Sequence, residues 1–145
     1  MTFMIGENMV GGYGSADILN GCSISVDLGE IAVVVGPNGA GKSTAMKAMF
    51  GMLDLHGGKV SIGGEDITAL APFERVKKGM AFVPQTNNVF TSMTVEENLE
   101  MGAFINPGPI ASIMEQVYSL FPVLKEKCHQ CAGELSGGQR QQVAV

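Results

Sequence analysis

The stretch Gly36-Pro37-Asn38-Gly39-Ala40-Gly41-Lys42-Ser43-Thr44 decides the fold of this 145-residue chain. It matches the pattern G-x-x-x-x-G-K-[ST] in full, and the apolar run IAVVV (residues 31–35) precedes it directly. A short, continuous, β-branched run predicts a strand that is buried on both faces, as in a parallel sheet. A helix is expected from about Lys42 to Phe50. This order of strand, glycine loop and helix predicts an α/β fold with a phosphate-binding loop.

The residue types of this loop suit a phosphate chain. Glycines let the backbone wrap closely and aim its N–H groups inward, where larger side chains would block the phosphates. The positive end of the following helix attracts an anion. Lys42 can reach the β- and γ-phosphates, and the Ser43 hydroxyl can ligate Mg²⁺. The alternative is a glycine-rich turn with no ligand, which the joint presence of strand, motif and helix disfavours.

A second glycine loop, Leu135-Ser136-Gly137-Gly138-Gln139, lies near the other end of the sequence. Alone it is a weak signal, because small glycine loops often open helices. Paired with the first loop in this chain order, it resembles the signature motif of the ATP-binding subunits of ABC transporters. The resemblance covers essentially the whole chain. It implies a P-loop NTPase (ABC-type ATPase) core with an antiparallel β subdomain and a helical subdomain, truncated after the signature motif.

The resemblance also implies how the two loops work together. In this family two subunits pack head to tail, and the signature loop of each closes on the γ-phosphate held by the other. ATP and Mg²⁺ are the expected cofactors, and Lys42 and Gln85 are the candidate catalytic residues. The expected nucleotide-binding residues are Tyr13, Gly36, Asn38, Gly39, Ala40, Gly41, Lys42, Ser43, Thr44, Ser136, Gly137, Gly138 and Gln139.

Two of these positions lie outside both glycine loops. Tyr13 falls where the family places an aromatic ring that stacks on adenine; the alternative is an ordinary turn tyrosine. Gln85 falls at the family's Q-loop glutamine, which approaches Mg²⁺ and the attacking water; the alternative is a solvated loop glutamine. The resemblance therefore implies metal contacts from Ser43 and Gln85.

The resemblance gives a finer, weaker indication of substrate. Residues 79–104, and most closely VFTSMTVEENLEMGAF within them, resemble the importers of branched-chain amino acids. Permease subunits in the membrane would be direct partners, and a separate substrate-binding protein would be an indirect one. The expected location is peripheral, on the cytoplasmic face of the inner (plasma) membrane. Because nothing in these residues recognises an amino acid, the transported substrate is open.

The pattern along the chain predicts a mixed α/β portion to about residue 86 and a mainly helical portion from about residue 87 to 145. Strands are expected in residues 3–14, 18–30 and 79–84, with a hairpin at Gly63-Gly64 and a short helix in residues 72–78. Thr94-Val95-Glu96-Glu97 has the Ser/Thr-x-x-Glu form of a capping box, so a helix is expected to start there. Residues 106–109 should break that helix, and a further helix over residues 110–120 should end before Pro122. Residues Ile113, Val117, Leu120 and Phe121 should share one face of that further helix.

One feature of the family is missing from these 145 residues. Family members carry an apolar strand ending in Asp-Glu after the signature helix, and then a histidine. Here no acidic residue follows Glu134 and no histidine follows His129. We therefore expect a fragment that hydrolyses ATP poorly or not at all, with residues 31–35 as an unpaired apolar sheet edge.

Composition narrows the remaining classes. The net charge is −5, with 14 acidic and 9 basic residues, which argues against a nucleic-acid partner. No stretch predicts a membrane span or a secretory signal. Cys128 and Cys131 have C-x-x-C spacing but lack a second pair for a metal site. The alternatives left open are a catalytically incomplete nucleotide-binding or partner-docking fragment and a soluble ABC-type ATPase outside transport.

Overall fold

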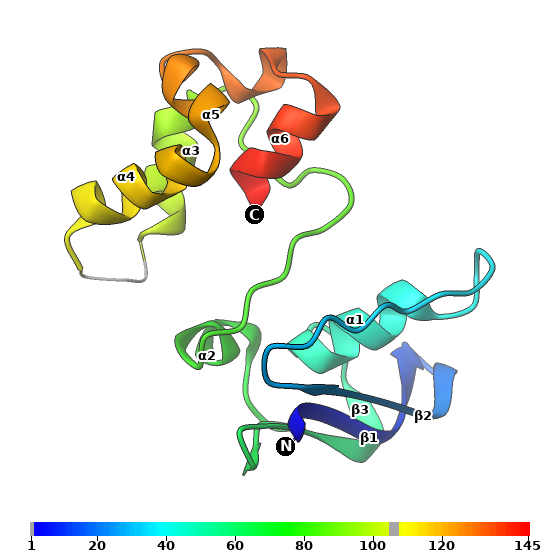
Figure 1. The fold of residues 1–145 in the computed structure, drawn as a ribbon. Coiled ribbons are helices and arrows are strands. Elements are labelled where there is room, and N and C mark those ends of the chain that lie inside the picture. Colours follow the sequence, from blue (N-terminus) through cyan, green and yellow to red (C-terminus); the bar gives the residue numbers. More distant parts are fainter. Residues whose placement is uncertain (1, 105–107) are drawn as a thin grey trace. The chain divides into compact units, whose positions relative to one another are not determined.

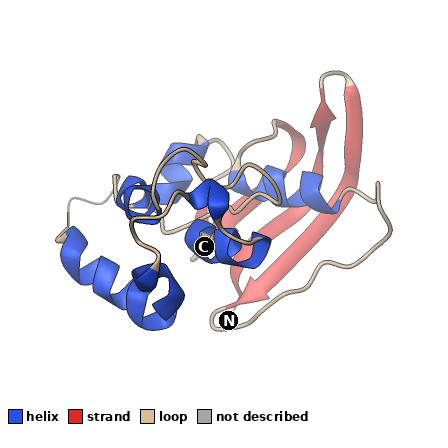
Figure 2. Cartoon of the chain, turned by 90° about the horizontal axis from the view of Figure 1, so that it is seen from above, coloured by secondary structure: helices blue, strands red, loops and turns tan. Residues whose placement is uncertain are grey.

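The computed structural model describes residues 2–104 and 108–145, and it divides the chain into two compact units, Met1–Ala81 and Phe82–Val145. Figure 1 traces both along the chain, and Figure 2 shows the strands and helices by type. The first unit holds all the strands of the described residues, and the second is helical. Part of the predicted break over residues 106–109 lies outside the described residues.

The first unit is built on an antiparallel sheet in the order β2-β1-β3-β4. The strands are β1 (Thr2–Tyr13), β2 (Ala16–Asp27), β3 (Leu55–Ile62) and β4 (Glu65–Asp66). The predicted first two strands and the hairpin at Gly63-Gly64 are confirmed. Gly63 and Gly64 both have positive φ, which allows the tight connection between β3 and β4.

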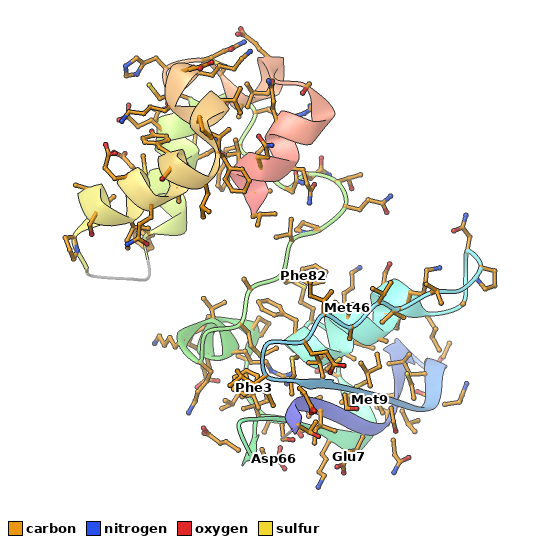
Figure 3. All side chains as sticks on the ribbon, in the orientation of Figure 1. Phe3, Glu7, Met9, Met46, Asp66 and Phe82 are labelled. Carbon is orange, nitrogen blue, oxygen red and sulfur yellow. The ribbon has the colours of Figure 1, made fainter. Side chains whose placement is uncertain are left out.

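Helix α1 (Lys42–Phe50) contacts β1 and β2, and α2 (Pro72–Lys77) follows the sheet in the chain. The bounds predicted for α1 are confirmed. The core joins the buried face of α1 to the sheet, with Met9, labelled in Figure 3, fully buried. The other buried apolar members include Leu19, Ala45, Ala48, Met49, Val60 and Ile67.

The predicted buried strand in residues 31–35 is wrong. The segment is an extended loop, and the side chains of Ile31, Val33 and Val35 are 89%, 76% and 83% exposed. In the described part of the chain, no strand lies beside residues 31–35, because the four-stranded sheet has β2 and β4 as its edges. A β-branched run favours a strand only where a partner supplies the ladder of hydrogen bonds.

The predicted strand in residues 79–84 is also wrong. Those residues form no strand, although Met80 is buried at the start of the segment. The reason is the same as for residues 31–35, since a parallel strand needs neighbours on its edges. Apolar composition therefore identified segments that fit a sheet interior, but the described strands do not pair with them.

The second unit contains α3 (Val95–Gly102), α4 (Ile110–Leu120), α5 (Pro122–Glu126), a 3₁₀ turn (Ala132–Glu134) and α6 (Gly137–Ala144). The predicted helix over residues 110–120 and the capping box at Thr94 are confirmed. Pro122 follows α4 and is also the first residue of α5, a position where the backbone N–H that proline lacks has no partner within the helix. The buried core consists of Val95, Leu124, Leu135 and Val143.

The predicted apolar face of α4 is partly wrong. Val117 and Phe121 pack against the core, and Tyr118 joins them, whereas Leu120 is 74% exposed. The buried stripe is therefore rotated from the expected one towards Tyr118. Helical spacing gave the period of the stripe, but the position of the neighbouring helices decides its centre.

Candidate nucleotide-binding site

Two left-handed glycines shape the loop before α1. Gly39 and Gly41 have φ values of 85° and 86°, and Gly41 is the residue that caps the helix. L side chains rarely adopt this conformation, so the sequence meets a backbone requirement with glycine at both positions. Residues 36–40 are exposed, and the first turn of α1 carries no acidic side chain. The loop therefore presents bare backbone and a positive helix end.

The ammonium of Lys42 is folded across this loop. Its Nζ donates hydrogen bonds to the carbonyl oxygens of Gly36 and Pro37, at 2.8 Å each. Both acceptors are neutral, so phosphate oxygens would be stronger partners for the same donor. The adjacent Ser43 hydroxyl is exposed at the start of α1. These groups fit a polyphosphate, and Ser43 supplies one neutral oxygen of the kind that Mg²⁺ accepts.

Tyr13 lies beside the same helix. It ends β1, its side chain is 51% exposed, and its hydroxyl lies 3.4 Å from Nζ of Lys47 on α1. The structure thus brings Tyr13 and the phosphate loop into one unit, joined through α1. Sequence reasoning missed Lys47, which carried no motif; its only signal was its place one to two helical turns after Lys42.

The signature loop begins α6 in the second unit. Ser136 caps the helix and accepts a hydrogen bond from the Gln139 backbone at 3.3 Å, while Oε1 of Gln139 accepts from the Ser136 backbone at 3.2 Å. Leu135, only 4% exposed, anchors the loop in the core. Gly137 and Gly138 are exposed and would meet nothing if they carried a Cβ. The loop is thus a capped helix end with two exposed glycines.

Gln85 shares a cavity with this loop. The cavity measures about 310 Å³ and is lined mainly by polar residues, among them Gln85, Asn88, Gly137, Arg140 and Gln141. The Asn88 amide donates to Oε1 of Gln141 at 2.8 Å, which joins the segment after Gln85 to α6. Of the predicted residues, Gln85 and the signature loop therefore lie together in the second unit. Asn88 and Arg140 were missed, since isolated polar residues in a loop or a helix give no sequence signal.

Metal ligation by His, Cys, Asp and Glu has no support in the described residues. Across residues 2–104 and 108–145 no group of three such side chains is placed to hold an ion. Cys22, Cys128 and Cys131 are half-buried free thiols. A membrane span is likewise not found, as none of the described helices has the length and apolar character to cross a bilayer.

Comparison with known proteins identifies the family. The model of the ABC transporter family matches residues 19–145, so the chain belongs to that family. It is 41% identical over 135 residues to a probable branched-chain amino acid transport ATP-binding protein, LivF, of Archaeoglobus fulgidus, covering 92% of this chain and 57% of that protein. The chain thus spans less than two thirds of this relative.

Other relatives carry other substrate names. A sulfate/thiosulfate import ATP-binding protein, CysA, of Nocardia farcinica is 36% identical over 135 residues, covering 92% of this chain and 40% of that protein. Among solved structures, the ADP conformation of an ATP-binding cassette of an ABC transporter matches with a TM-score of 0.81 and 33% identity, covering 99% of this chain and 63% of that one. The predicted fold class is confirmed, while the substrate is not fixed by these names.

Proposed function

We propose that the chain is the nucleotide-binding part of an ATP-binding subunit of an ABC importer, which couples ATP binding and hydrolysis to transport. The observation that carries the proposal is the phosphate loop: two left-handed glycines open α1, and the Lys42 ammonium is held across them by two neutral carbonyls. Transport of branched-chain amino acids is the finer proposal, supported by the name of the Archaeoglobus fulgidus relative.

The proposed chemistry starts with exchange of partners at Lys42. Phosphate oxygens replace the Gly36 and Pro37 carbonyls, and the loop amides and the α1 dipole hold the remaining negative charge. Mg²⁺, when bound, would neutralise charge on the phosphate oxygens, with Ser43 and Gln85 as its expected protein contacts. Tyr13 would stack on the base.

The proposed partners follow from the signature loop. Ser136 and the Gly137 and Gly138 amides would contact the γ-phosphate held by a second ATP-binding subunit, a copy or a related chain. Permease subunits would dock on the helical portion, about residues 87–145, and the assembly would place the chain at the cytoplasmic face of the membrane. A substrate-binding protein would act only through the permeases.

Lys42→Ala tests the proposal. The variant should lose ATP binding in titration calorimetry, because it removes the ammonium that lies across the phosphate loop and would bind the phosphate oxygens. Lys59→Ala is the matched control, since Lys59 is an exposed cation on β3 paired with Glu7 at 3.2 Å. Unchanged ATP affinity in the Lys42 variant would contradict the proposal.

The second candidate is nucleotide binding without hydrolysis by these 145 residues. Among the described residues, Lys42 offers the loop a cation for phosphate contacts, and the first turn of α1 carries no acidic side chain. Binding and phosphate release measured side by side on the 145-residue polypeptide separate the candidates. Binding without release supports the second, and release at a rate typical of intact enzymes supports the first.

A further inference from the structure

Lys47 and Tyr13 are in contact, and neither residue belongs to the phosphate loop. Nζ of Lys47 lies 5.7 Å from the centroid of the Tyr13 ring and 3.4 Å from its hydroxyl oxygen. The first distance is within the range of cation–π attraction, and the second joins the tip of the ring to the same ammonium. Lys47 is half-buried, while about half of Tyr13 is exposed.

The position of the pair relative to the phosphate loop is set by α1. Lys47 follows Lys42 by five residues, which corresponds to about 7.5 Å along a helix. The start of the helix is fixed on β2, where Gly41 lies against Ile18 and Leu19. Tyr13 ends β1, the strand paired with β2. The sheet and α1 therefore hold the ring at a set distance from the phosphate loop.

We propose that Lys47 is a positioning residue for the nucleobase: it holds the Tyr13 ring so that its free surface is ready to stack on the base of a bound nucleotide. The inference rests on the proposed nucleotide binding and deepens it. An exposed tyrosine at the end of a strand has two free side-chain torsions, and ordering them on binding weakens affinity. The ammonium of Lys47 orders the ring beforehand.

The proposal predicts a loss that depends on the base. Lys47→Met keeps the length and apolar character of the stem but removes the ammonium. It should weaken ATP binding about threefold to tenfold, the cost of ordering one side chain, and leave binding of inorganic tripolyphosphate unchanged. Lys47→Arg should restore ATP affinity, since a guanidinium also binds an aromatic ring.

Two further variants complete the test. In a Tyr13→Ala background, Lys47→Met should have no additional effect, because the residue acts only through the ring. Tyr13→Phe keeps the ring and removes the hydroxyl contact with Lys47, so it should weaken ATP binding and leave tripolyphosphate binding unchanged. It replaces Lys47→Met in the test if that variant proves unstable. Lys59→Met removes the exposed cation that pairs with Glu7, and it should leave the affinity for both ligands unchanged.

The opposing results are distinct. If Lys47→Met weakened the binding of ATP and of tripolyphosphate equally, Lys47 would act on the phosphates through its charge. That result would overturn the proposal. No change for either ligand, or an undiminished effect in the Tyr13→Ala background, would also overturn it. Failure of the underlying proposal looks different, since Lys42→Ala would then leave both ligands bound as before.

Discussion

The guanidinium of Arg75 lies against the C-terminal end of α1, with its Nη1 atom 2.7 Å from the carbonyl oxygen of Met49. Its Nε donates to Leu70 O at 2.9 Å and its Nη2 to Thr68 O at 2.8 Å. The side chain is only 2% exposed, and burial lowers the pKa of Arg75 from its usual range. The arginine thereby ties the helix that begins at the phosphate loop to the connection after β4, at the negative end of the helix dipole.

Arg75→Met should be strongly destabilising. It leaves the buried carbonyl of Met49 and the part-buried carbonyls of Leu70 and Thr68 without their donor, and each buried loss costs about 1–3 kcal/mol. A total decrease of about 3 kcal/mol in the free energy of unfolding is expected. Denaturant unfolding measures it, with Lys77→Met on the same helix as control, because Lys77 is exposed and should cost little. Equal losses for the two variants would contradict the proposed role of Arg75.

Gly51→Ala should disturb the same junction by crowding. A Cβ at Gly51 would lie 2.7 Å from Nε of Arg75 and 3.1 Å from Leu70 O. Gly64 has the same φ of 83° but open space around it. Both alanine variants bear the cost of positive φ, about 1 kcal/mol, and only Gly51→Ala adds the clash. The difference in unfolding free energy between the two isolates that clash, and no difference would mean that Arg75 moves aside freely.

The phosphate loop and α1 could be predicted from sequence because their determinants are local. Gly39 and Gly41 adopt the left-handed conformation that favours glycine, and the helix that starts at Lys42 is capped at its C-terminal end by Gly51. Residues 31–35 could not be placed, since a strand is defined by its partner and not by its own composition. The burial of Arg75 was invisible for a related reason, as a lone arginine on a short helix usually lies in solvent.

The signature loop depends on its helix cap, as the Ser136 and Gln139 hydrogen bonds indicate. Ser136→Ala should reduce the stability of α6 by about 1 kcal/mol. Hydrogen exchange should accelerate at the first amides of α6 and stay unchanged in α3. Thr94→Ala is the matched variant, because Thr94 caps α3 with the same type of box, and it should give the reverse pattern. Acceleration in both helices from either variant would mean that the two caps do not act separately.

Asp66 should contribute stability that depends on pH. The Thr68 hydroxyl and then the Thr68 backbone N–H donate to its carboxylate at 2.6 and 2.9 Å, and they lower the pKa of Asp66 from its ordinary 3.8. A lowered folded pKa means that the stabilisation is complete above pH 3.8 and is lost as the pH falls through the folded value. Asp66→Asn removes this dependence. The difference in urea midpoint between wild type and variant should shrink below pH 3.8, and a constant difference would refute the assignment.

Residues 31–35 should drive self-association of the 145-residue polypeptide. Val33 is 76% exposed in an extended segment whose neighbours Ile31 and Val35 are more exposed still, and such apolar extended segments readily pair with other chains. Val33→Lys should lower light scattering at high protein concentration, because charge on an extended segment opposes pairing. Met52→Lys is the control, as Met52 is a 50% exposed apolar residue of the same unit outside the segment. Thermal midpoints should stay close to wild type in both variants, and equal reduction of scattering by both would show that net charge, not this segment, governs association.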